Sequence, residues 1–343
     1  MVRTGLAMLF VLLVAAQSHG GELEQRSDLE LRTAAMFYRQ QFADMERVSR
    51  DFRENETRSP SGIWNLTSFY GGIEQAANTV DTDEQRWSGL ENRSMNWMTL
   101  FPKSPTAINA HAIVLIRHGM AYRGEGWASK VKDENWKPFR EYVAKAREHL
   151  LAHKQIAAPD PRWYETMLVV AKLDGWPPSQ FQALVDEAVT KHPYFYQIYF
   201  AAIDYLTPKW HGDKRKIEDF ANFAVKKTNA REQTGMYARI YWYASQVQYG
   251  TLLFTDSAVV WPRMKQGIDD VLRHYPDQWN INNFAQFACQ AGDRVKTEQL
   301  INRIETPMPE VWLSRQNASP HARPLEFGAC KNWTMSRRET TWR

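Results

Sequence analysis

Apolar and polar residues recur along most of the chain with the period of an α-helix. The clearest apolar stripe consists of Phe139, Tyr142, Val143, Ala146 and Leu150. Because residues at this spacing share one face of a helix, the stripe predicts an amphipathic helix. Ser27 and Glu30 form a capping box before a similar segment that ends near Arg53, and this pair predicts one long first helix. The alternation typical of strands is scarce, so the pattern predicts an all-α fold.

Proline and glycine divide the apolar pattern into repeated units. A proline near the start, an apolar helix and a glycine at or near the end occur in residues 101–126, 160–176, 192–213 and 275–293. Proline suits the first helical turn, and glycine suits the helix end. Pro161 and Pro193 lie 32 residues apart, close to the tetratricopeptide period of about 34 residues. We therefore expect an irregular right-handed α-solenoid of antiparallel, tetratricopeptide-like helix pairs.

Residues 1–20 have the pattern of a secretory signal peptide. Arg3 precedes an apolar run from Leu6 to Ala16, and the small residues Ala16 and Gly20 suit a peptidase. This run is shorter than the ~20 apolar residues of a membrane helix, and no later segment is apolar enough to span. We expect an exported protein, periplasmic or secreted, with no membrane span in the mature chain.

The rest of the chain divides into three predicted parts. Residues 21–100 hold N-terminal helices and a turn-rich connector, 101–305 form the tetratricopeptide-like helical repeat domain, and 306–343 form an irregular, proline-rich tail. The connector, residues 54–81, is expected to fold back on the first helix.

Composition and charge exclude few classes of protein. The chain has 343 residues, of which 43% are hydrophobic and 24% charged, as in ordinary globular proteins. The net charge of +4 is spread over 43 basic and 39 acidic residues, and the longest basic run is Lys214, Arg215 and Lys216. We therefore expect no nucleic-acid partner.

The two cysteines, Cys289 and Cys330, are a possible disulfide pair. An exported protein meets an oxidising compartment, where such a pair can join. The alternative is a buried free thiol at Cys289, on an apolar helix, and an unpaired thiol at Cys330 in the tail.

Histidine pairs are the only candidates for a metal site. His149 and His153 stand at i and i+4, but Leu150 occupies the position of the metalloprotease glutamate and no third ligand is marked. His111 and His118 lie seven residues apart and could share one face of a helix. They could equally be an interior histidine and a helix-end cation near Gly119. We expect no metal, no cofactor and no catalytic residue, because nucleophile elbows and phosphate-binding glycine loops are also missing.

Two turns combine aromatic and polar residues and are candidate binding sites. The candidate residues are Trp210, His211 and Asp213 in LTPKWHGD, and Arg123, Glu125 and Trp127 in AYRGEGWA. Rigid aromatic side chains beside polar groups are typical of ligand grooves. The structural alternative is that both turns only end helices, with Trp210 folded back on the preceding residues.

The order of several blocks resembles a family of bacterial proteins known as domain of unknown function 4034. The blocks are SGIWNLTSFYGG, W-x-x-x-FPKSP, AYRGEGWA, HPYFYQIYFAAIDYLTPKWHGD and FACQAGD. The resemblance implies an all-helical, repeat-like fold and brings no activity or catalytic residue.

These patterns support three hypotheses of function. The first is an exported helical-repeat protein that binds a protein or peptide through its inner surface without catalysis. The second is a cell-wall or glycan-acting hydrolase with a site around Arg123, Glu125, His211 and Asp213, which requires the two turns to converge. The third is a structural component of the cell envelope whose aromatic turns pack internally.

Overall fold

The structure, a computed structural model, describes residues 21–78, 81–124, 126, 128–210, 212–312 and 325–336. Within these ranges the chain is mostly helical, no strand occurs, and Arg58 and Trp64 form an isolated β-bridge. The predicted all-α helical-repeat class is therefore confirmed, whereas the right-handed sense of the solenoid stays a prediction. The expected signal peptide, residues 1–20, lies outside the described residues.

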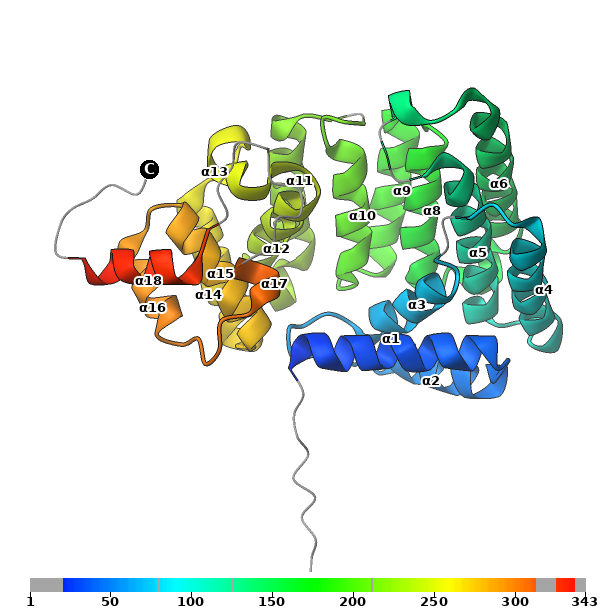
Figure 1. Ribbon diagram of the computed structural model, residues 1–343, viewed down its shortest axis with the longest axis horizontal. Coiled ribbons are helices and arrows are strands. Elements are labelled where there is room, and N and C mark those ends of the chain that lie inside the picture. The colour runs from blue at the N-terminus through cyan, green and yellow to red at the C-terminus, as the bar shows by residue number, and fades with distance from the viewer. Residues whose placement is uncertain are drawn as a thin grey trace, which may run out of the picture.

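The centre of the fold is a row of helices that are buried on most of their faces (Figure 1). The row consists of α5 (Pro105–Arg123), α8 (Arg162–Leu173), α10 (Tyr196–Leu206), α12 (Gly235–Ala244) and α15 (Gln278–Gln290). All but α12 come from the proline-to-glycine segments of the sequence. Helices that are apolar around most of their circumference, such as YQIYFAAIDYL in α10, must be covered on several sides.

A second set of helices, which carry more exposed residues, packs against this central row. They are α4 (Glu84–Leu100), α6 (Asp133–Ala152), α9 (Pro178–Lys191), α11 (Lys214–Glu232), α14 (Trp261–His274) and α16 (Arg294–Ile301). The predicted stripe lies on α6, where Phe139, Val143, Ala146 and Leu150 are buried. α6 packs on α5, α14 on α12 and α16 on α15.

Short helical turns join these elements. They are η1 (Ala128–Lys130), α7 (Lys154–Ala157), the π-helical turn η2 (Ser245–Tyr249), η3 (Gly250–Leu252), α13 (Leu253–Asp256), α17 (Pro309–Trp312) and α18 (Phe327–Met335).

The N-terminal helices cover another side of the central row. They are α1 (Glu22–Tyr38), α2 (Phe42–Glu54) and α3 (Asn65–Ala76). Figure 1 shows α1 along the lower edge of the view beside α2 and α3, and contacts join α3 to α5 and α1 to α15. α1 and α3 approach closely at Gly72, where a Cβ would lie 2.3 Å from the carbonyl oxygen of Glu30.

The prediction of one long first helix is wrong. α1 begins at Glu22, before the expected capping box, and the chain leaves it at Arg39. Gln40 adopts φ 56°, a left-handed conformation that commonly ends a helix. The amide of Gln41 then donates to the carbonyl of Met36 at 2.9 Å, and α2 starts in a new direction.

The connector between α2 and α3 does fold back on the first helix, and it also reaches the central row. The hydroxyls of Ser59 and Ser61 donate to the carboxylate of Glu22 at 2.8 and 2.7 Å. The Ser61 carbonyl accepts from Arg239 Nη2 at 2.8 Å and from Asn280 Nδ2 at 3.1 Å. The connector therefore contacts α12 and α15 as well as α1.

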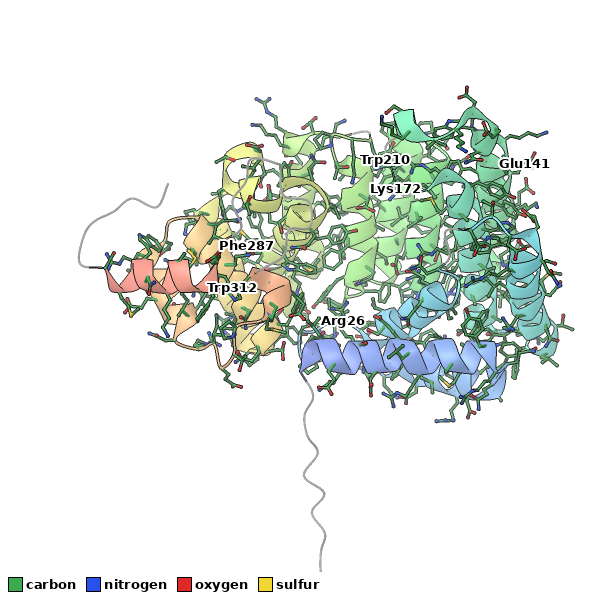
Figure 2. The ribbon with its side chains drawn as sticks, in the orientation of Figure 1. Arg26, Glu141, Lys172, Trp210, Phe287 and Trp312 are labelled. Carbon is green, nitrogen blue, oxygen red and sulfur yellow. A yellow bond between two sulfur atoms is a disulfide. The ribbon has the colours of Figure 1, made fainter. Side chains whose placement is uncertain are left out.

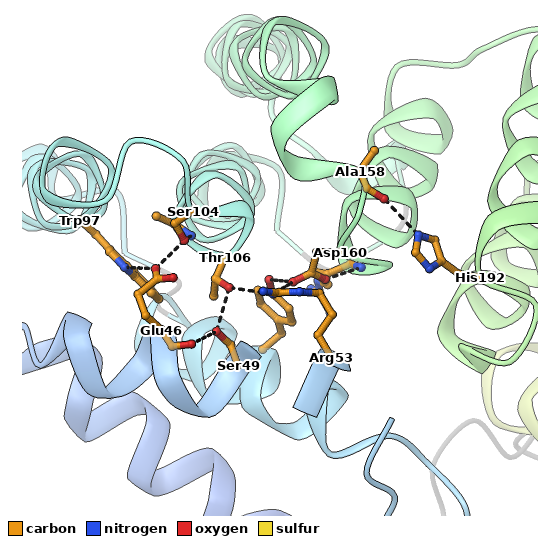
Figure 3. Close-up of polar contacts among 12 residues, drawn as sticks. Glu46, Ser49, Arg53, Trp97, Ser104, Thr106, Ala158, Asp160 and His192 are labelled. Carbon is orange, nitrogen blue, oxygen red and sulfur yellow. Dashed lines mark hydrogen bonds and ion pairs between the residues drawn. The ribbon is translucent and has the colours of Figure 1, made fainter. Parts of the chain in front are cut away.

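A buried polar network fixes α2 against the start of α5 and α8 (Figure 3). Arg53 Nη1 lies 3.0 Å from Asp160 Oδ2, and the Asp160 side chain is fully buried. Tyr70 donates to the same oxygen at 2.7 Å, while the Ser49 and Thr106 hydroxyls bond at 2.8 Å. These groups satisfy one another in a region where water does not compete.

The C-terminal part is more ordered than the predicted irregular tail. A disulfide joins Cys289 of α15 to Cys330 of α18, with the sulfurs 2.06 Å apart. Trp312 of α17 donates to Asn282 Oδ1 at 2.8 Å. The described residues after 305 thus include α17 and α18, both attached to α15.

Candidate binding cleft between α3, α5 and α8

A cleft of about 230 Å³ lies where α3, α5 and α8 meet. Its aliphatic walls consist of Ile113, Ile116 and Met120 from α5 and Val169 and Leu173 from α8. Local sequence signals place both walls. Ser104 caps α5 by accepting from the amide of Ala107 at 2.9 Å, which fixes the start of that helix. Asp160 lies just before α8 and accepts from the amide of Arg162, the first residue of the helix, at 2.9 Å.

Buried charges form one end of the cleft. The Arg162 side chain is 7% exposed and forms ion pairs with Glu74 and with Glu165, whose Oε1 lies 3.0 Å away. The guanidinium also lies over the ring of Tyr70 at 5.2 Å. Burial raises the pKa of Glu165 to about 7, against the opposing effect of Arg162. This end of the cleft therefore holds one cation between two carboxyl groups.

Several polar atoms of α8 at the cleft lack a partner. Arg162 Nε, Glu165 Oε2 and Thr166 Oγ1 are buried and make no hydrogen bond within the described part of the chain. Unpaired buried polar atoms are costly and uncommon in native structures, so each is a candidate contact for a bound group. This turn of α8 is therefore a candidate ligand-binding surface.

Cations and an aromatic ring border the other end of the cleft. Lys172 Nζ donates to Asp204 Oδ2 at 2.8 Å and lies 5.5 Å from the centre of the Trp210 ring. Figure 2 shows the labelled Lys172 and Trp210 side by side. Arg117, on the α5 side, donates to Asn78 Oδ1 at 2.8 Å. Trp210, a predicted binding residue, thus adjoins the cleft through Lys172.

Asp213 has a structural role. It caps α11 by accepting from the amides of Arg215 and Lys216 at 2.8 and 3.0 Å, and these hydrogen bonds lower its pKa. His211, its predicted partner, lies outside the described residues. An exposed carboxylate engaged with two amides is a helix cap.

Arg123 stabilises its own loop through hydrogen bonds. Its Nη1 donates to the carbonyls of Gly124 and Gly126 at 2.9 and 3.2 Å, and burial lowers its pKa. Glu125 and Trp127 lie outside the described residues. The structure thus places Trp210 beside Lys172 of the cleft and gives Arg123 and Asp213 local contacts elsewhere.

The histidine pairs are held by hydrogen bonds. His149 Nε2 donates to the Ile108 carbonyl at 3.0 Å, and His153 Nδ1 donates to the His149 carbonyl at 2.9 Å. His111 Nδ1 lies 2.8 Å from Ser94 Oγ. No group of three or more metal-ligating side chains occurs in the described part of the chain.

His118 is an interior histidine between aromatic rings. Its ring stacks on Trp87 at 4.5 Å and on Tyr142 at 3.8 Å. Its nitrogens lie 2.7 Å from Glu91 Oε1 and 3.3 Å from Glu84 Oε1. The His118 side chain, which belongs to α5, thus contacts both α4 and α6.

Acidification is expected to destabilise the contact between α5 and α6. Burial lowers the pKa of His149 to about 4, with nearby His111 as a further cause, and burial also lowers the pKa of His111. An unfolded histidine titrates near ~6.5, so this stability is complete above that pH and is lost as the pH falls toward about 4. At ~1.4 kcal/mol per pKa unit, and allowing for solvent at the half-buried ring, the loss is about 2 kcal/mol.

Urea unfolding between pH 7 and pH 4 measures this loss. The variant His149→Gln should flatten the pH dependence, and the exposed control His274→Gln should retain it. The assignment fails if the wild type and both variants show the same slope.

Comparisons with known proteins add no relative. No family model, curated protein or solved structure matches the chain, so the resemblance to domain of unknown function 4034 stays a prediction. Within the described residues, no helix is both long and apolar enough to cross a membrane.

The residues of α8 carry a local signal for the cleft. In RWYETMLVVAKL the polar residues Arg162, Thr166 and Lys172 interrupt an apolar helix. A fully packed central helix has no need of charges, so polar residues along its length indicate a lined surface. The aromatic turns are easier to identify from sequence, because their residues are adjacent in the chain.

Proposed function

We propose that the chain is an exported helical-repeat protein that binds a peptide or protein segment in the cleft between α3, α5 and α8. The observation that carries the proposal is a preformed cleft with aliphatic walls, charged ends and unpartnered polar atoms. Ligand sites typically combine apolar walls with a few placed polar groups. No catalytic step is part of the proposal.

The lining of the cleft favours a peptide that carries an aliphatic side chain. Ile116, Val169 and Leu173 offer surface to an aliphatic group. Glu74, with its side chain 39% exposed, suits a basic neighbour on the ligand, and Arg117 suits an acidic one. Opposite charges at an apolar cleft set the direction and register of a bound segment.

The hydrolase alternative has less support. The Asp213 carboxylate already accepts the hydrogen bonds that cap α11, and the Arg123 guanidinium already donates to the carbonyl of Gly124 in its own loop. A general base needs a carboxylate or imidazole within reach of a substrate proton. The envelope-component alternative predicts that Trp210 only packs internally, yet its ring is half-buried at Lys172.

A charge in the cleft is expected to weaken peptide binding. Peptides selected from a random display library on the mature protein should share an aliphatic residue with a charged neighbour. Met120→Glu, at the half-buried rim of α5, should weaken the best peptide at least about tenfold, because a carboxylate on an apolar wall must be desolvated. Fluorescence anisotropy with a labelled peptide measures the change.

The matched control is Met95→Glu, which makes the same substitution at a methionine that is 53% exposed on α4. It should bind like the wild type. Equal weakening in both variants, or a library that yields no enriched peptide, would count against the proposal.

A further inference from the structure

A second cavity, separate from the cleft, lies where the π-helical turn η2 meets α15 and α17. It measures about 50 Å³ and includes Gln246, Thr251, Trp279, Asn283, Gln286 and Gln290 in its lining. We call it the amide pocket. Figure 2 shows Phe287 of α15 near Trp312 of α17, and Gln286 Nε2 donates to the Val311 carbonyl at 2.8 Å, which joins the two helices at the pocket.

The amide pocket is polar and almost uncharged. Its hydrogen-bonding groups are side-chain amides and hydroxyls, no lysine, arginine or histidine is among its lining residues, and its single carboxylate belongs to the exposed Glu310. Amides and hydroxyls both donate and accept hydrogen bonds. This lining suits a neutral ligand whose groups also donate and accept, and it offers no counter-ion to an anion.

Part of this hydrogen-bonding capacity is unused. Thr251 Oγ1 and Gln290 Oε1 are buried and have no partner among the described residues. Asn283 is held in place, because its Oδ1 accepts from Trp242 Nε1 at 2.9 Å and its Nδ2 donates to the Trp279 carbonyl at 2.8 Å. The pocket thus combines fixed groups with unpaired ones, as preformed polar sites do.

One wall of the amide pocket follows an irregular stretch of backbone. α12 continues into the π-helical turn Ser245–Tyr249, and Gly250 then adopts φ 52°. Such turns are rare, cost regular hydrogen bonding and occur frequently at functional sites. The π-helical turn brings Gln246, and η3 brings Thr251, to the face of α15 that holds Asn283 and Gln290.

We propose that the amide pocket binds the hydroxyl edge of a neutral sugar. A cavity of about 50 Å³ holds roughly four waters, and the adjacent hydroxyls of one sugar ring can replace such a group of waters. Trp279 supplies the apolar surface that a sugar ring needs beside its hydrogen bonds. This inference does not depend on the peptide cleft, whose lining residues are different.

The test uses methyl glycosides of glucose, galactose, mannose and N-acetylglucosamine with the full mature protein. Saturation-transfer NMR should detect binding of at least one of them. Gln290→Leu should weaken that ligand by about tenfold, the size expected for a lost hydrogen bond in a buried site, and the exposed control Gln182→Leu should not. Methyl glucuronide should bind more weakly than methyl glucoside, because Glu310 repels its carboxylate.

Hydrogen exchange on the wild type makes the test independent of how well a variant folds. Bound sugar should slow exchange in residues 245–252 and 283–290. Failure of every neutral glycoside to bind, or binding that protects other segments and is unchanged in Gln290→Leu, would overturn the proposal.

Discussion

Replacing Asp160 with alanine is expected to lower the free energy of unfolding by about 3–5 kcal/mol. The carboxylate is fully buried and accepts from Arg53, from the Tyr70 hydroxyl and from the amide of Arg162 (Figure 3). Alanine would leave the Arg53 guanidinium, whose side chain is only 16% exposed, without its counter-ion. Breaking one partner of a buried pair costs more than the pair itself contributes.

Urea unfolding followed by tryptophan fluorescence measures the effect. Asp186→Ala is the matched control, because Asp186 is an exposed aspartate on α9 that accepts from Gln182. Its cost should stay within about 0.5 kcal/mol. A similar cost at both positions would show that the network in Figure 3 does not hold α2 in place.

Removing the disulfide is expected to cost about 4 kcal/mol. Cys289 and Cys330 are 41 residues apart and join α18 to α15, and closing a loop of that size restricts the unfolded chain by about this amount. Cys330→Ser should therefore melt at a lower temperature than the wild type and should exchange its α18 amides faster.

Reduction provides the control, because the chain has no other cysteine. The wild type in dithiothreitol should match Cys330→Ser, and the variant itself should not respond to dithiothreitol. A reductant-sensitive variant, or a wild type that melts at the same temperature in both states, would contradict the assignment.

Most of the central row could be predicted from sequence because its signals are local. A proline start and a glycine stop identified the segments that became α5, α8, α10 and α15. α12 was missed because it begins at Gly235 without a proline, although GMYARIYWYA has the same apolar character. The break between α1 and α2 was missed because the left-handed conformation falls on Gln40, a residue type that seldom adopts it.

The contact of the connector with α12 and α15 could not be predicted, because it joins residues that are distant in sequence. Ser61 meets Arg239 and Asn280, which follow it by 178 and 219 positions. The cleft could not be predicted for the same reason, because its walls come from helices that are separate in sequence. Trp210 could be named from its turn, but its position beside Lys172 of the cleft could not be predicted, because the two residues are far apart in sequence.

Methyl NMR of the protein with a selected peptide tests the central claim most directly. The claim predicts that the methyl resonances of Ile116, Val169 and Leu173 in the cleft shift on binding. The methyls of Leu151 and Val295, which are 49% and 76% exposed and lie outside the cleft, should stay unchanged. Peptide binding that leaves the cleft methyls unmoved and shifts others would contradict it.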